Sequence, residues 1–292
     1  MRLLTAQQFQ RASTLFCAME YIRRNSGDVS LGEKEFSIGM WVGGEATPND
    51  RKRAIQSRKE LIERPTRAEN PFVLLKCPWC NAKMGPYYDG KKSRVIGYHA
   101  GYHDKRSDNK QKTVLYRCED NSCDFGFIPT SNNCLPIKVI DEDLINSPPN
   151  LIIGTVDKFA MLTWDPKFRS LFGIDNNGDH DGLPPSLIIQ DELHLISGPL
   201  GSMVGAYETV IEELCTLYDD GRVIKPKIIA STATISRARE QVNALYARDK
   251  MMLFPPSGLE ASDSFFSKES RDDSNNLKPG RLYLGVMAPG HG

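Results

Sequence analysis

The sequence predicts an α/β protein in which helices cover a parallel β-sheet. Three short apolar runs, each followed by a helical pattern, support this prediction at residues 151–153, 186–189 and 227–230. Short apolar runs that alternate with helices are typical of parallel strands buried on both faces of a sheet. A cysteine-rich, basic segment separates these runs from the first helix, so we also expect an inserted subdomain.

Length and composition favour a soluble protein with two folded units. At roughly 150 residues per domain, a chain of 292 residues is long enough for two. With 40% hydrophobic and 25% charged residues, it has a globular composition, which excludes a coiled coil, a collagen-like fibre and wholesale disorder. It has no apolar run near the ~20 residues that cross a bilayer, and no signal-peptide core at its start. We therefore expect a cytoplasmic protein with no membrane contact.

The charge is distributed unevenly, although 37 basic residues balance 37 acidic ones. Between Arg51 and Arg117 there are 17 basic and 6 acidic residues, a local charge of +11. Such an asymmetry indicates a segment that meets phosphate, or else a solvated insertion. Composition alone does not separate these two interpretations.

The elements follow in order along the chain. Apolar residues recur every three or four positions over residues 5–24, which predicts an amphipathic helix with Thr5 as its N-cap. A basic helical stretch at 51–63, the cysteine region and a Ser/Asn/Pro-rich exit at 146–149 come next. Beyond residue 150, the three strands alternate with helices expected at 156–162, 199–218 and 237–246. A polar loop at 255–279 leads to a last expected strand at 281–285.

An acidic pair follows the second apolar run, in the sequence Asp191-Glu-Leu-His194. At the carboxyl end of a strand, one carboxylate can hold Mg²⁺ beside bound phosphates, and a second can deprotonate an attacking water. The alternative is an acidic cap on a helix N-terminus. Small polar residues end the neighbouring strands too, at Gly154-Thr155 and at Ser231-Thr-Ala-Thr234. Open α/β sheets place their ligands at such an edge, which favours the first interpretation.

Four of the seven cysteines fall in two close pairs, Cys77 with Cys80 and Cys118 with Cys123. In a cytosolic chain such pairs indicate a tetrahedral zinc site, and four protein ligands make it structural rather than catalytic; the alternative is free or oxidised thiols. The 37 residues between the pairs are more than a compact zinc ribbon has. Three nearby residues could replace a cysteine as ligand: His99, His103 and Cys134.

Basic and aromatic residues surround these cysteines. The most prominent cations are Lys91, Lys92, Lys105 and Arg106, with Arg51-Lys-Arg53 further upstream. Tyrosines lie among them at positions 87, 88, 98 and 102. Cations with aromatic rings suit single-stranded nucleic acid, through phosphate neutralisation and base stacking. Alternatively, the tyrosines pack a small zinc domain and the lysines keep it soluble.

On these motifs the chain resembles the first RecA-like domain of a superfamily 2 helicase. Asp191–His194 matches the DExH form of motif II, and Thr232-Ala-Thr234 matches motif III. The turn at Gly154-Thr155 resembles motif Ic, and Arg2-Leu-Leu-Thr5 resembles the end of motif Ia. Within that superfamily, segments 2–11, 190–201 and 285–290 are similar to the DrmA-like helicase component of the DISARM anti-phage defence system.

The resemblance implies a domain organisation and a set of roles. Residues 1–25 and 150–292 would form a partial RecA-like domain, and residues 26–149 an insertion with a zinc-binding part at about 72–138. Asp191 would hold Mg²⁺, Glu192 would polarise water, and His194 with Thr232 and Thr234 would relay the nucleotide state to the DNA groove. The implied cofactors and partners are ATP, Mg²⁺, DNA and a further subunit of the defence system. The implied DNA-contacting residues are Arg2, Thr5 and Thr155.

One element of a P-loop ATPase has no good match. The nearest approach to Gly-x4-Gly-Lys-Ser/Thr is the segment 85–92, which has Lys92 in place of the hydroxyl residue. We interpret it as a chance match, and expect the true loop upstream of Met1 and a second RecA-like domain beyond Gly292. The 292-residue chain is then predicted to be inactive alone. The alternatives are a zinc-containing nucleic-acid-binding module without ATPase activity, or an ATP-driven translocase that does not unwind DNA.

Overall fold

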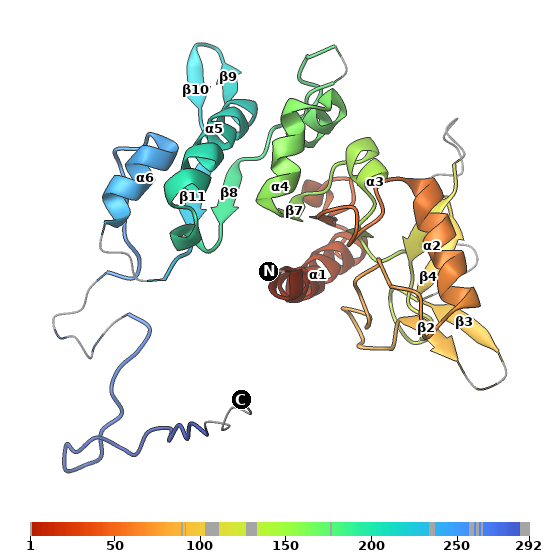
Figure 1. Ribbon diagram of the computed structural model, residues 1–292, viewed down its shortest axis with the longest axis horizontal. Helices are drawn as coiled ribbons and strands as arrows, with labels where there is room; N and C mark the ends of the chain where they lie inside the picture. The colour runs from red at the N-terminus through yellow and green to blue at the C-terminus, as the bar shows by residue number, and fades with distance from the viewer. Residues whose placement is uncertain are drawn as a thin grey trace, which may run out of the picture. The chain divides into compact units, whose positions relative to one another are not determined.

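A computed structural model describes residues 2–88, 90, 92–102, 111–126, 133–175, 177–233, 237–256, 260, 263 and 265–286, with side chains from residue 5 onwards. The chain divides into two compact units, residues 1–235 and 236–292. The first unit contains helix α1 (Arg2–Asn25), the cysteine region and two small parallel sheets. It is a mixed α/β unit, as the sequence predicts, and Figure 1 shows its elements.

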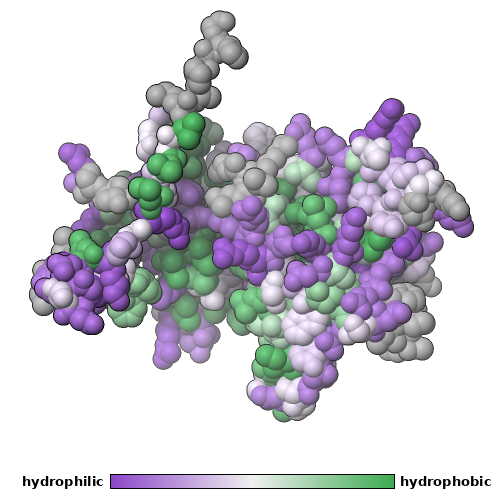
Figure 2. Space-filling view, turned by 90° about the horizontal axis from the view of Figure 1, so that it is seen from below, coloured by the Kyte–Doolittle hydropathy of each residue, from purple (hydrophilic) through white to green (hydrophobic). Residues whose placement is uncertain are grey.

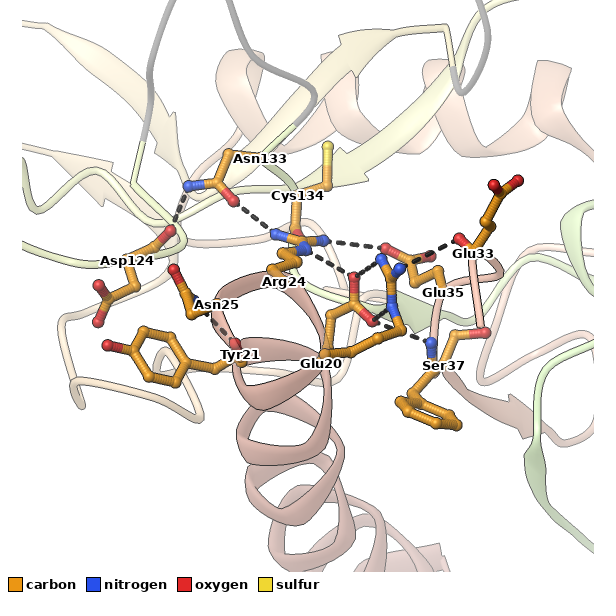
Figure 3. A network of polar contacts seen from close by, with 12 residues as sticks. Glu20, Tyr21, Arg24, Asn25, Glu33, Glu35, Ser37, Asp124, Asn133 and Cys134 are labelled. Carbon is orange, nitrogen blue, oxygen red and sulfur yellow. Dashed lines mark hydrogen bonds and ion pairs between the residues drawn. The ribbon is translucent and has the colours of Figure 1, made fainter. Parts of the chain in front are cut away.

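Helix α1 has the predicted amphipathic character, but it begins at Arg2, so the predicted N-cap Thr5 lies inside the helix. Phe9, Phe16 and Cys17 lie on its buried side, which packs into the larger of two hydrophobic clusters. Its last turn is fixed by the fully buried Glu20, whose carboxylate accepts hydrogen bonds from Arg23, Arg24 and the Phe36 N–H at 2.6–3.0 Å. Figure 3 shows how this network joins the end of α1 to the segments that follow it.

The first parallel sheet contains a strand that the sequence analysis missed. Strand β1 (Ile38–Trp41) lies between β6 (Ile137–Lys138) and β7 (Leu151–Gly154), and both pairings are parallel. Gly39 interrupts the apolar pattern of β1 because a β-carbon there would lie 2.4 Å from Leu144 and 2.8 Å from Pro149. Close packing at this position therefore excludes the side chain that would have made the strand recognisable.

The described residues of the cysteine region include one helix and two antiparallel strand pairs. Helix α2 (Arg51–Glu63) has the predicted bounds, and Asp50 caps it by accepting a hydrogen bond from the Arg53 N–H. Strand β2 (Gly85–Tyr88) pairs with β3 (Ser93–Ile96), and β4 (Tyr98–Gly101) pairs with β5 (Thr113–Tyr116). Phe72, Tyr98 and Tyr116 are fully buried between these elements.

The second parallel sheet lies later in the chain. Strand β8 (Leu187–Gln190) pairs in parallel with β11 (Lys227–Ala230). Helix α5 (Gly198–Leu214) and the hairpin of β9 (Leu217–Asp219) and β10 (Arg222–Ile224) lie between them in sequence. The expected helix over 199–218 is therefore shorter at its end, because Tyr218 belongs to β9. The remaining short helices of this unit are η1 (Val29–Leu31), α3 (Asp141–Asn146), α4 (Val156–Phe159), η2 (Ala160–Thr163), η3 (Pro166–Phe172) and η4 (Leu193–Leu195).

The three predicted strands do not form one continuous sheet in the described residues. Strand β7 joins β1, whereas β8 and β11 form a sheet of their own. The two sheets still share a hydrophobic cluster, because Ile152 of β7 and Ile188 of β8 both pack against it. Ile211 and Cys215 contribute to the same cluster from α5 and the residue that follows it.

In the described residues of the second unit there is one helix, α6 (Ala238–Tyr246), close to the predicted 237–246. The expected strand over 281–285 is wrong: these residues form no strand, and Leu282 and Leu284 are 81% and 82% exposed. An apolar pattern without a pairing partner does not make a strand. No helix in the described residues is both long enough and apolar enough to span a membrane.

Candidate functional site

The acidic motif lies at the carboxyl end of β8, where the strand prediction put it. Asp191 is half-buried, and its Oδ2 accepts a hydrogen bond of 2.5 Å from the Gln8 side-chain amide. Its Oδ1 accepts a second, of 3.0 Å, from the backbone N–H of Glu192. The Asp191 carboxylate is therefore held in one orientation from both sides.

Glu192 turns the chain sharply at this point. Its φ of 53° and ψ of 43° are left-handed, a conformation that few residues other than glycine adopt and that costs of order 1 kcal/mol. The turn lets the Leu193 N–H donate to the Ser231 carbonyl at 3.0 Å and buries the Leu193 side chain. It also places the Glu192 carboxylate 3.3 Å from Nδ1 of His194.

The end of β11 meets this turn, but through its backbone rather than its hydroxyls. The Ser231 N–H donates to the Gln190 carbonyl at 2.8 Å, and the Ala233 N–H lies 3.4 Å from His194 Nδ1. Thr232 is exposed, and Thr234 lies outside the described residues. Hydrogen bonds thus join the predicted motif II and motif III segments at one sheet edge.

Thr155 takes a different place. It follows β7 as the N-cap of α4, and its N–H donates to the Trp41 carbonyl at 3.3 Å. Nearby Lys158 forms a buried ion pair of 2.5 Å with Asp141. Within the described part of the chain, no hydrogen bond joins Thr155 to Asp191. Thr5 is half-buried in α1, and the Arg2 side chain lies outside the described residues.

Gln8 is the residue of this site that sequence reasoning missed. It lies on α1, 183 positions before Asp191. Its neighbour Phe9 is in the core, so the helical pattern places Gln8 near the buried side, but no local pattern names its partner.

The four predicted cysteines form a second site. The Sγ atoms of Cys77, Cys80, Cys118 and Cys123 all lie within 4.8 Å of one another, and those of Cys80 and Cys118 are 3.4 Å apart. A tetrahedral zinc ion with bonds of about 2.3 Å requires sulfurs about 3.8 Å apart. The donor set and its spacing therefore fit a metal ion, and the cluster could hold one.

Two tight turns present these thiols. The Cys77 N–H donates to the Ala82 carbonyl, and Asn81 takes a left-handed φ of 65° to close the first turn. In the second turn the Gly126 N–H donates to the Cys123 carbonyl at 2.7 Å. A β-carbon at Gly126 would lie 2.6 Å from the Asp120 carbonyl oxygen, so this turn requires glycine.

Aromatic packing anchors the cysteine cluster on α1. Trp79, inside the first turn, stacks on Tyr21 with ring centroids 5.1 Å apart and meets Phe125 edge-on. Three of the four cysteines are buried, Cys80 being the exception. The cluster is therefore part of the main hydrophobic core rather than a detached finger.

Burial and hydrogen bonding act in opposite directions on these thiols. Burial raises the pKa of Cys118 to about 12 and also raises the pKa of Cys77 and of Cys123. Burial opposes ionisation of Cys80 as well, but hydrogen bonds from the Ala82 N–H and the neighbouring thiols leave its pKa below the usual value. A bound cation would favour the thiolate form of all four.

None of the other candidate metal ligands, two histidines and a cysteine, is found in the cluster within the described part of the chain. Cys134 lies outside the cluster, and its sulfur accepts a hydrogen bond of 3.2 Å from Arg117. His99 is on β4, with Nε2 3.5 Å from Glu119, and is not part of the cluster either. His103 lies outside the described residues. Among described residues, the cluster therefore consists of the four predicted cysteines.

The predicted basic surface is only partly described. Lys92 is exposed, whereas Lys91, Lys105 and Arg106 lie outside the described residues. Tyr98 is fully buried and donates to the Leu74 carbonyl, so it belongs to the core. The segment at 85–92 begins with β2 and continues into the paired strand β3 rather than into a helix, which agrees with its interpretation as a chance P-loop match.

Comparison with known proteins gives one informative similarity. No family model matches the chain. The chain is 36% identical, over 322 aligned positions, to the DISARM protein DrmA of Bacillus paralicheniformis. This alignment covers the whole chain but only 27% of the relative's length. The similarity supports a DrmA-like relationship, with this chain corresponding to about a quarter of that protein.

Proposed function

From its relationship to DISARM protein DrmA, we propose that this chain is part of an anti-phage defence protein that hydrolyses ATP to move along DNA. The main observation behind this proposal is that β8 and β11 pair in parallel. At their carboxyl ends, hydrogen bonds connect the segment 190–194 to the segment 231–233. A RecA-like helicase domain has its acidic motif and its small-residue motif on neighbouring parallel strands, and this arrangement is consistent with that fold.

The residues of the edge suit the proposed roles. The Asp191 carboxylate has the oxygen donors that Mg²⁺ prefers, and the one ion pair that Glu192 forms within the described part of the chain is its contact with His194. ATP would supply the reacting phosphate, while Glu192 accepts the proton of the attacking water. His194, with Thr232 and Thr234, would couple the nucleotide bound at this edge to the DNA groove. Arg2, Thr5 and Thr155 would line that groove.

The cysteine cluster has a structural role in this proposal. Its four thiols leave no open coordination position on a zinc ion, so the metal would fix the fold of the region rather than react. The surrounding cations, including Lys91, Lys92, Lys105 and Arg106, would then contact the DNA backbone. A further subunit of the defence system would complete the assembly.

A second candidate function is a zinc-containing DNA-binding module whose α/β part is only scaffold. The completeness of the cysteine cluster, all of whose ligands lie in this chain, favours it. A third, an ATP-driven translocase that never separates strands, differs from the main proposal only in its action on duplex DNA. A strand-displacement assay separates that case from a helicase.

The test is the substitution Glu192→Gln in a full-length protein containing these residues. Glutamine keeps the size of the side chain but cannot accept a proton, so DNA-stimulated ATP hydrolysis should fall by ~10²–10⁴ while nucleotide binding is nearly unchanged. The matched control Glu240→Gln changes an exposed residue of the second unit and should leave hydrolysis unaltered.

Two results would contradict the ATPase proposal. One is full-length activity that is indifferent to Glu192→Gln, which would make the acidic pair a helix cap. The other is Glu192-dependent hydrolysis by the 292-residue chain alone, because we expect phosphate positioning to need a Gly-Lys-Ser/Thr loop that this sequence does not contain.

A further inference from the structure

Two lysines face each other across the first cysteine turn. Lys76 precedes Cys77, Lys83 follows Ala82, and the two lysines pair directly in an antiparallel bridge. Both are exposed, and neither forms an ion pair within the described part of the chain. Like charges directly opposite each other are destabilising. The turn that presents two of the thiols therefore also presents two ammonium groups that no carboxylate pairs with among the described residues.

The adjoining hairpin adds a third cation and holds it in place. Tyr87 of β2 lies directly opposite Arg94 of β3. The Arg94 guanidinium carbon is 5.1 Å from the Tyr87 ring centroid, and the Lys83 ammonium nitrogen is 5.4 Å from it. Each cation–π contact is worth about 0.5–1 kcal/mol at an exposed site. The ring thus keeps two cations close together despite their repulsion.

Other cations of the basic segment are engaged elsewhere. Arg51 is buried in an ion pair of 2.7 Å with Asp143. Arg53 lies 3.2 Å from Glu60, and Arg58 donates to the Tyr98 carbonyl at 2.6 Å. Lys76, Lys83 and Arg94 differ from these three arginines in that they form no ion pair or backbone hydrogen bond of this kind among the described residues, and in that a shared tyrosine ring gathers two of them. In the space-filling view, the side of the molecule where β2 and β3 lie is largely hydrophilic (Figure 2).

We infer that Lys76, Lys83 and Arg94 form a contact site for the phosphodiester backbone of single-stranded DNA, with Tyr87 holding two of the cations in position. Arginine suits this role because its planar guanidinium pairs with two phosphate oxygens at once, and the lysines add point charges. Tyr88, the next residue of β2, faces the other side of the hairpin, because successive side chains of a strand alternate, so it takes no part in this site. The inference rests on the DNA contact proposed above and assigns part of it to residues that the sequence analysis did not select.

The test measures binding of the 292-residue chain to a short fluorescein-labelled oligothymidylate by fluorescence anisotropy over a series of salt concentrations. Each phosphate contact contributes about 0.7 to the slope of log affinity against log salt for a single strand. The triple variant Lys76→Gln, Lys83→Gln, Arg94→Gln should therefore lower the slope by about 2. The control Lys34→Gln, Lys250→Gln, Lys278→Gln removes the same charge elsewhere and should leave the slope unchanged.

Further experiments test which ligand binds and whether the variants stay folded. A charge-preserving variant, Lys76→Arg with Lys83→Arg, should keep the slope, and unchanged metal content should show that the cysteine turns are intact. Inorganic phosphate at matched ionic strength should not displace the oligonucleotide, and displacement would assign the site to a free phosphate instead. An equal decrease of the salt slope in the control triple variant would show that net charge alone sets the slope, and would overturn the inference.

Failure of this inference is distinct from failure of the proposed function. An unchanged slope in the hairpin variant, with wild-type binding intact, would overturn only the assignment to Lys76, Lys83 and Arg94. Preferential binding of duplex over single strand, lost in the same variant, would overturn the single-strand assignment. Absence of any DNA binding by the wild-type chain would overturn both this inference and the proposed DNA contact.

Discussion

The cysteine cluster and the acidic sheet edge differ in how fully this chain builds them. The four thiols come from two tight turns and lie within the main hydrophobic core. Asp191 and Glu192, by contrast, end a two-stranded sheet on which Ile189 and Ile229 remain 60% and 46% exposed. Each cysteine turn places its own pair of thiols locally, and the core brings the two turns together. A site at a sheet edge depends on residues contributed from distant parts of the chain, such as Gln8.

Among these predictions, loss of the metal should reduce stability the most, and the loss should be confined to the cysteine region. We expect about one zinc ion per chain by elemental analysis, and near zero for Cys80→Ser. Because structural zinc supplies on the order of 10 kcal/mol of folding free energy in small domains, the cysteine region should become sensitive to protease. The sheet of β8 and β11 should keep its hydrogen-exchange protection.

Cys134→Ser is the matched control for the metal experiment. Cys134 lies in the same region but outside the cluster, so this variant should keep its metal. Zinc far below one ion per wild-type chain, with all thiols freely titratable, would contradict the predicted site and remove the contrast between the two regions.

A buried carboxyl group of α5, beside the sheet of β8 and β11 in sequence, should change the free energy of unfolding by an intermediate amount. Glu208 is 7% exposed, and burial, with a smaller contribution from Glu212, raises its pKa to about 7. The folded state therefore favours the protonated form, so stability is highest below the unfolded pKa and falls as the pH rises towards 7. Glu208→Gln should remove this loss and raise the free energy of unfolding by up to roughly 3 kcal/mol at pH 8, but little at pH 4.

Urea denaturation at both pH values checks the Glu208 prediction. The control is Glu213→Gln, an exposed residue on the same helix that should change neither value by much. Equal stabilisation at pH 4 and pH 8 would show that the pKa of Glu208 is the same in the folded and unfolded states, which would contradict the prediction.

The smallest effect should come from Gln8, the distant contributor to the acidic edge. Gln8→Ala removes one hydrogen bond to a half-buried carboxylate and should lower the free energy of unfolding by about 1 kcal/mol. Hydrogen exchange at the Leu193 amide should speed up accordingly, whereas Gln7→Ala, on the exposed side of α1, should leave it unchanged. If Gln8→Ala has no effect, backbone contacts alone hold the edge, and the two regions are more alike than we infer.

The sequence predicted what is local and missed what is distant. The two cysteine pairs, the bounds of α2 and the runs that became β7, β8 and β11 are all readable within a few residues. Strand β1 was missed because Gly39 is required by the packing of Leu144 and Pro149, which no nearby residue reveals.

The sheet arrangement could not be predicted for a related reason. An apolar run indicates a buried strand but not its neighbour, so the pairing of β7 with β1 depends on contacts across more than a hundred residues. The run at 281–285 has the pattern of a strand but no partner within the described residues, and its side chains are exposed. Gln8 has the same difficulty, since its partner is 183 positions away.

Helix α1 connects the two regions mechanically. Gln8, near its start, contacts Asp191, and Tyr21, near its end, stacks on Trp79 inside the cysteine turn. At 1.5 Å per residue, these two contacts are about 20 Å apart along one uninterrupted helix. An α-helix of this length bends little and hardly compresses. A displacement of Gln8 along the helix axis would therefore also move Tyr21, so α1 is one rigid connection between the acidic edge and the cysteine turn.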